Sequence, residues 1–279
     1  MALLKRIGAT VQLTSGRLTS LRFDEVRRKP SVSDLLCLQH LTHLQQVDFY
    51  GTHVTVEVLQ ALASLPELQS ISLNCCRLID DTAIHALSGL QSLNALYLMD
   101  TAVTDATVEQ LKGFGHLRRL RVDGTKQTGK TVARLLETHR LEELWLDGDQ
   151  ASPRCIEHIV QCESLRSLAL IGPSVTDETV APLAAATFIS ELSILRARIT
   201  DKSIQKLSAL VHLRTLGLND CAGVTDAAKF DPFGALEQLW LQNTGITVDG
   251  LNALKAVCPG VSIWPTPQWL MNQAAPAHG

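Results

Sequence analysis

The sequence predicts an α/β fold built as a solenoid of stacked strand–turn–helix units. A Leu-x-x-Leu-x-Leu pattern, or a close apolar equivalent, recurs about every 24 residues through most of the 279-residue chain. A fixed period of this size is typical of one supersecondary unit stacked on copies of itself. Each unit also changes its hydrophobic period from two to three, which indicates a strand followed by a helix. The nine copies begin at Leu44, Leu68, Leu93, Leu117, Leu141, Leu165, Ile189, Leu213 and Leu236.

The copy that begins at Leu93 shows why each unit has this form. Leu96 and Leu98 alternate as the inward residues of a short strand. Thr104 and Asp105 then supply side chains that cap a helix. Because every strand leads into a returning helix, we expect the strands to pair in parallel. The apolar stripe of a helix of roughly two turns follows at a spacing of three, as Val108, Leu111 and Phe114.

The turn motifs carry a resemblance to a known family. Two units read Cys76-Arg-Leu-Ile-Asp-Asp81 and Cys221-Ala-Gly-Val-Thr-Asp226, whereas others read as Thr101-Ala-Val-Thr-Asp105 does. Residues 44 to 264 thereby resemble the leucine-rich repeat family, with cysteine-containing and Thr-type repeats mixed. The resemblance implies a curved horseshoe with a parallel β-sheet on the concave side and short helices on the convex side. It also implies that protein binding is the usual role.

Both ends of the repeat array are expected to be capped, because a solenoid must cover its terminal edges. Residues 1–43 are predicted to form an N-terminal cap, with a hairpin over 11–23 and a helix over 31–41. Residues 44–258 hold the nine repeats, and residues 259–279 form a capping strand and a Pro-containing tail. Trp269 in this tail is expected to plug the core or to serve as a short partner motif.

Composition limits the compartment and the partner class. The net charge of −3 and the pI near 6.3 give no reason to expect nucleic acid or an anionic membrane. The seven cysteines are an odd number and several stand at core positions, which favours reduced thiols in the cytoplasm. Residues 1–23 are basic and contain no acidic residue, so a mitochondrial targeting signal is the alternative.

One segment matches a phosphate-binding motif. Residues Gly124 to Thr131 fit G-x-x-x-x-G-K-[ST], and they follow a predicted strand and open a predicted helix. Nucleotide binding is therefore one alternative function. Register disfavours it, because nearly every residue of the segment aligns with an ordinary repeat turn; Gln127 and Lys130 are the main departures. A substrate-recognition subunit of a ubiquitin ligase is a second alternative, although no F-box-like module precedes the repeats.

Signals for catalysis and for metal binding are weak. Cys155, His158 and Cys162 lie near one helix face, but no fourth ligand is apparent and two of their neighbours belong to the expected core stripe. No nucleophile elbow is present, and no histidine falls on the concave strand positions. We expect no catalytic residue, no cofactor and no metal.

The residue types on the predicted concave face differ from those of the core. Counting from the first leucine of each repeat, the third, fifth and seventh residues should point away from the core. Both tyrosines and three of the four tryptophans of the chain stand at these positions, whereas Phe49, Phe114 and Phe233 do not. Tyr, Trp and Arg are the residues enriched at binding hot spots. The predicted partner contacts are Asp48, Tyr50, Tyr97, Met99, Arg119, Arg121, Glu143, Trp145, Asp147, Ile171, Leu195, Trp240 and Trp264.

Small residues separate two of these tryptophans. Between Trp145 and Trp240 the fifth position holds Ala169, Ser193 and Gly217, so a trough of about 20 Å is expected across four strand spacings. The sequence therefore predicts a non-enzymatic adaptor or scaffold that binds a protein partner on its concave face, within a larger complex. In the alternative, the side chains only cover the sheet, with Arg121 against Trp145 and Arg119 paired to Glu143.

Overall fold

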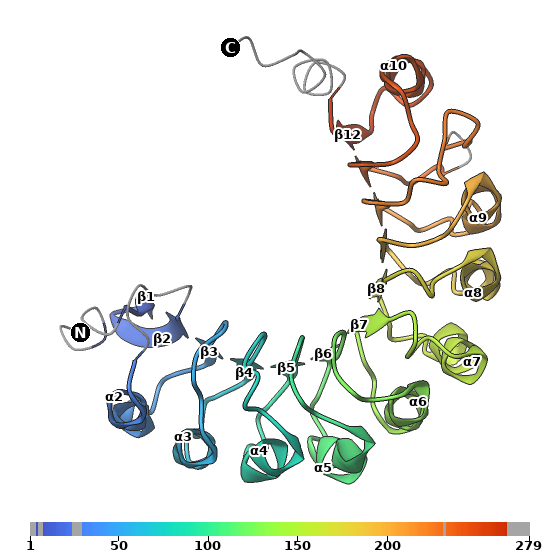
Figure 1. Cartoon of the computed structure of the whole chain (residues 1–279). Helices are drawn as coiled ribbons and strands as arrows, with labels where there is room; N and C mark the ends of the chain where they lie inside the picture. Colours follow the sequence, from blue (N-terminus) through green and yellow to red (C-terminus); the bar gives the residue numbers. More distant parts are fainter. Residues whose placement is uncertain (1–3, 5–7, 24–29, 231–232, 267–279) are drawn as a thin grey trace, which may run out of the picture. The chain divides into compact units, whose positions relative to one another are not determined.

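The computed structural model describes residues 4, 8–23, 30–230 and 233–266. The chain divides into two compact units, Met1–Leu141 and Glu142–Gly279. In both units a strand of the sheet is followed by a turn and, in most repeats, by a helix on the far side of the core (Figure 1). The predicted motif at Trp269 lies outside the described residues.

In the first unit the sheet begins with a hairpin. Strands β1 and β2 pair antiparallel across a turn at Ser15 and Gly16, and the later strands are parallel and follow sequence order. The strands are β1 (Thr10–Thr14), β2 (Arg17–Arg22), β3 (Gln46–Asp48), β4 (Ser70–Ser72), β5 (Ala95–Tyr97) and β6 (Arg119–Arg121). The helices are α2 (Val32–Leu36), η1 (Cys37–His40), α3 (Val56–Leu62), α4 (Asp81–Ala86), η2 (Asp105–Thr107), α5 (Val108–Gly113) and α6 (Gly129–Thr138).

The second unit has the same organisation, with parallel neighbours throughout. Its strands are β7 (Glu143–Asp147), β8 (Ser167–Ile171), β9 (Glu191–Leu195), β10 (Thr215–Gly217), β11 (Gln238–Trp240) and β12 (Ser262–Trp264). Its helices are α7 (Pro153–Gln161), α8 (Asp177–Val180), η3 (Ala181–Ala185), α9 (Asp201–Leu207) and α10 (Val248–Val257).

Two repeats of the second unit depart from the predicted two-turn helix. Helix α8 has only four residues and continues as the 3-10 helix η3, which contains Pro182. In the repeat that begins at Leu213, the described residues between α9 and α10 contain no helix. There Phe230 and Phe233 are buried, with ring centroids 6.3 Å apart, and fill the space that a helix stripe would fill. The sequence places a proline at 232, and a proline disfavours helix at the residue before it.

The core lies between the sheet and the helices. Inward strand residues such as Leu144 and Leu146 are 0% exposed, and helix residues such as Ile156 and Ile159 are buried as well. Cys76 fills a turn and its thiol donates to the carbonyl of Phe49, the residue that stacks on Phe23 with centroids 5.3 Å apart. Among the described residues no helix is long and apolar enough to cross a membrane.

A carboxylate ladder ties neighbouring repeats together at their helix starts. An Asp of one repeat accepts a backbone N–H and a hydroxyl hydrogen bond from the corresponding Thr of the next repeat, at 2.6 to 2.8 Å; in four of the five pairs this Asp opens a helix. The backbone bond satisfies the N–H of the Thr, and the second bond satisfies its hydroxyl. Gly129 and Pro153 occupy this position in two repeats and cannot serve it. The pairs are Asp81 with Thr104, Asp105 with Thr128, Asp177 with Thr200, Asp201 with Thr225 and Asp226 with Thr247.

Candidate functional site

The third, fifth and seventh residues of each repeat form what we call the sheet face. Along β7 the exposure alternates residue by residue, because Leu144 and Leu146 are buried whereas Glu143, Trp145 and Asp147 are half-buried. This is the alternation that the pleat of a strand imposes. The predicted contact residues of β7 therefore point away from the core. The exposed fraction of the other predicted residues differs from strand to strand.

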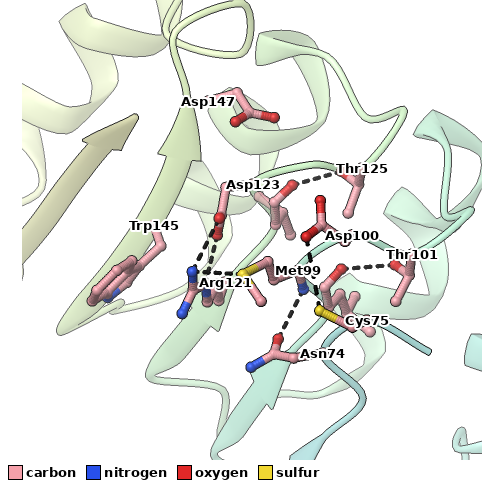
Figure 2. Close-up of polar contacts among 12 residues, drawn as sticks. Asn74, Cys75, Met99, Asp100, Thr101, Arg121, Asp123, Thr125, Trp145 and Asp147 are labelled. Atoms are coloured by element: carbon pink, nitrogen blue, oxygen red, sulfur yellow. Dashed lines mark hydrogen bonds and ion pairs between the residues drawn. The ribbon is translucent and has the colours of Figure 1, made fainter. Parts of the chain in front are cut away.

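In the first unit, Arg121 is held by a buried acid. Its Nε donates to Asp123 Oδ1 at 2.7 Å and its terminal nitrogen to Asp123 Oδ2 at 3.1 Å, while the same nitrogen approaches Met99 Sδ at 2.7 Å (Figure 2). Asp123 is only 4% exposed. A two-bond fork of this kind fixes the plane of the guanidinium. Asp123 was not among the predicted contacts; its place at the seventh position, two residues after Arg121 on the same face, is the signal that could have found it.

The other predicted residues of the first unit are described by single polar contacts or by their exposure. Arg119 is exposed and donates to the side-chain oxygen of Asn94 at 3.1 Å. Tyr50 is 39% exposed, and Tyr97 is half-buried. Asp48 lies 3.5 Å from the guanidinium of Arg22 on the neighbouring strand.

Asparagine side chains order the strand ends on the same face. The Asn74 side-chain oxygen accepts the backbone N–H of Met99 at 2.9 Å in the first unit, and Asn219 accepts that of Gln242 at 2.9 Å in the second. A side chain that bonds the next strand is fixed in direction. The residues just beyond adopt left-handed backbone, with φ of 60° at Cys75 and 62° at Asp220.

In the second unit, Trp145 and Trp240 stand on either side of a row of small residues. Trp145 donates from Nε1 to Glu143 Oε1 at 3.0 Å, and Trp240 is 41% exposed. On the adjacent strand Trp264 stands opposite Trp240 in the register of β11 and β12, so two indoles mark this end of the face. On the three strands between Trp145 and Trp240, Ala169 and Gly217 are buried and Ser193 is half-buried. A row of small residues therefore lies between the aromatic side chains of this face.

Gly217 lies close to Ser193 of the neighbouring strand. A β-carbon added there would lie 3.0 Å from the Ser193 hydroxyl oxygen, which is tighter than ordinary contact. Leu195, two residues after Ser193 on the same strand, is half-buried.

Ile171 does not contribute as the sequence predicts. Its side chain is 3% exposed, so it offers almost no surface to a partner. Strand β8 pairs along all five of its residues with β7 and β9, which places Asp147 and Leu195 on either side of Ile171. The position of a residue in the repeat predicts the direction of its side chain. It does not predict how far the side chains of the neighbouring strands cover it.

The segment that matches the phosphate-binding motif is occupied by an internal carboxylate. Asp105 accepts the backbone N–H of Thr128 at 2.7 Å and the hydroxyls of Thr128 and Thr131 at 2.8 and 2.6 Å. These are the donor types with which a helix start would bind a phosphate. Gln127 is buried and donates to the Thr107 hydroxyl at 2.7 Å, which gives it a structural role.

The weak metal signal finds no support in the arrangement of the side chains. Burial raises the pKa of the Cys155 thiol to about 12, and His158 Nδ1 lies 2.8 Å from the Arg154 carbonyl oxygen. A thiol with so high a pKa is protonated at neutral pH. Among the described residues, no group of three or more His, Cys, Asp or Glu side chains is arranged to hold a metal ion.

Comparison with solved structures identifies the fold class. The chain resembles an internalin (inlF) of Listeria monocytogenes str. 4b F2365, with a TM-score of 0.55 and 21% identity over 82% of this chain and 62% of that one. An internalin C2 (inlC2) of the same strain gives a TM-score of 0.41 with 19% identity, over 82% of this chain and 80% of that one. No family model and no curated protein matches the chain. Internalins are leucine-rich repeat proteins, and the fold is an α/β leucine-rich repeat solenoid. The chain spans 62% of the inlF chain.

Proposed function

We propose that this protein is a non-enzymatic adaptor or scaffold that binds a protein partner on the sheet face of its second unit. The observation that carries the proposal is the row of small residues Ala169, Ser193 and Gly217 between Trp145 and Trp240, which we infer to form a depression with these residues as its floor. An indole that is 41% exposed has apolar area for a partner to bury, together with a polar N–H. Trp240 and Trp264 supply one anchor and Trp145 the other.

The width of the proposed depression supports an extended peptide or a helix as the occupant. A depression about four strand spacings wide accommodates an extended segment or one helix of a partner. The Nε1–Glu143 hydrogen bond holds the Trp145 ring in one orientation, so less side-chain freedom is lost when a partner binds. Arg119, Arg121, Tyr50, Tyr97 and Met99 form a second set of contacts, on the sheet face of the first unit.

The competing functions have less support. Asp105 fills the place where a nucleotide phosphate would bind, so nucleotide binding would require breaking three internal hydrogen bonds. No observation favours a ubiquitin-ligase subunit. None of the seven cysteines forms a disulfide, which supports the cytoplasm as the compartment, with the mitochondrion as the alternative.

Affinity purification of the full chain from its native cell tests the proposal. A Ser193→Arg variant places a long charged side chain in the depression while leaving the core residues of β9 unchanged. We expect a partner that co-purifies with the wild type to be lost with Ser193→Arg. The matched control is Lys206→Arg on the exposed side of α9, which should retain it. If Ser193→Arg retains every partner that the wild type binds, the proposed surface is wrong.

A further inference from the structure

A pocket on the helix side of the second unit lies where the carboxylate ladder is interrupted. Pro153 stands at the first position of α7, where most repeats place the Asp that binds the next cap. The Thr176 N–H, which such an Asp would bind, donates instead to the Thr179 hydroxyl at 3.4 Å. Without the tie, the start of α7 and the start of α8 enclose a pocket of about 220 Å³.

The lining of this pocket is apolar at its floor and acidic at its rim. Ala151 and Ile156 are buried beneath it, and Pro153 and Pro182 form its walls. Thr179 of α8 and Pro182 of η3 line the pocket on either side of Ala181, where the four-residue helix α8 passes into η3. Cavities of about 150 Å³ hold benzene, so this volume holds one branched aliphatic side chain.

Both charged residues of the lining are glutamates. Glu157 is exposed on α7, and Glu178 is exposed on α8, where its carboxylate accepts the Thr176 hydroxyl at 2.6 Å. That hydrogen bond lowers the pKa of Glu178, and Lys202 acts in the same direction whereas Asp177 opposes it. Glu178 is therefore ionised at neutral pH. Two carboxylates beside an apolar floor are complementary to an aliphatic side chain with cationic neighbours.

We propose that this pocket is a second protein-binding site, which takes one aliphatic side chain of a partner with Lys or Arg at the adjacent positions. The aliphatic side chain fills the space over Ile156, and the flanking cations lie near Glu157 and Glu178. This site is separate from the depression on the sheet face and does not depend on it.

Methyl NMR of the full chain tests the site with defined peptides. The probe is acetyl-Lys-Leu-Lys-amide, and the signals to follow are the methyl groups of Ile156 and Ala151, with the core Ile204 in α9 as reference. We expect saturable shifts at Ile156 and Ala151 with a dissociation constant of roughly 1 to 10 mM. Acetyl-Glu-Leu-Glu-amide and acetyl-Lys-Gly-Lys-amide should bind at least about threefold more weakly.

Protein variants then separate this site from other surfaces. Glu157→Lys should weaken the Lys-Leu-Lys peptide by about three- to tenfold, whereas Glu163→Lys, the same charge change just beyond the other end of α7, should leave it unchanged. Trp240→Ala should have no effect, which makes failure here distinguishable from failure of the sheet-face proposal. The inference is overturned if Ile156 and Ala151 do not shift up to about 20 mM peptide, if the three peptides bind alike, or if both charge variants weaken binding equally.

Discussion

At the scale of single residues, the carboxylate of Asp105 both links two repeats and argues against a phosphate site. Asp105 accepts three hydrogen bonds from the next repeat, and it thereby occupies the site that the sequence match suggested for a phosphate. The sequence alone could align this segment with ordinary turns. It could not place the Asp of one repeat against the N–H of the next, because that contact depends on how repeats stack.

Asp105→Asn is expected to reduce the free energy of unfolding by about 1 to 3 kcal/mol at pH 7, since an amide cannot accept all three bonds. Burial alone would raise the pKa of Asp105, but the hydrogen bonds from Thr128 and Thr131 outweigh it and lower that pKa. The stabilisation is therefore present above the unfolded pKa, about 3.9, and is lost as pH falls through the lower folded value. Urea unfolding at pH 7 and at about pH 2.5 should show the difference between wild type and variant shrinking at the lower pH.

The control for this prediction is Glu163→Gln, an exposed carboxylate outside the ladder. It should change stability by less than about 0.5 kcal/mol at both pH values. An Asp105→Asn protein as stable as the wild type at pH 7 would show that the ladder does not stabilise the fold.

At the scale of elements, strands and turns could be predicted more completely than helices. The Leu-x-x-Leu-x-Leu pattern fixes which strand residues face the core, and Leu144 and Leu146 are indeed fully buried. Helix length is set instead by local breakers, so α8 ends at Val180 before Pro182, and Phe230 and Phe233 fill the core in a repeat where no helix is described. The low exposure of Ile171 depends on neighbouring strands, which a single repeat cannot reveal.

Two adjacent residues of β7 test this assignment of faces. Leu144→Ala removes a fully buried side chain and should reduce the free energy of unfolding by about 2 to 5 kcal/mol. Trp145→Ala, one residue later, should reduce it by less than about 1 kcal/mol, because the half-buried indole lies on the outward side of the strand. Denaturant unfolding of both variants measures the two values. Equal losses would mean that Trp145 belongs to the core and is not available to a partner.

At the scale of the whole molecule, the two compact units carry different sheet-face chemistry. The first unit presents arginines fixed by polar partners, such as Arg121 held by Asp123, whereas the second presents the tryptophans and the small residues between them. Fold and repeat number follow from the sequence period, because each copy repeats the same core positions. The partner does not follow from them, since recognition lies in the outward residues that differ between copies.

The central claim is that a protein partner binds between Trp145 and Trp240, and calorimetric titration tests it most directly. The full chain and its variants should be titrated with the partner that co-purifies with the wild type. We predict that Trp240→Ala weakens binding by about 30-fold, equivalent to about 2 kcal/mol, while Val211→Ala, which truncates an exposed side chain outside the sheet face, leaves it unchanged. Wild-type affinity in both Trp145→Ala and Trp240→Ala, together with a loss in Val211→Ala, would contradict the account.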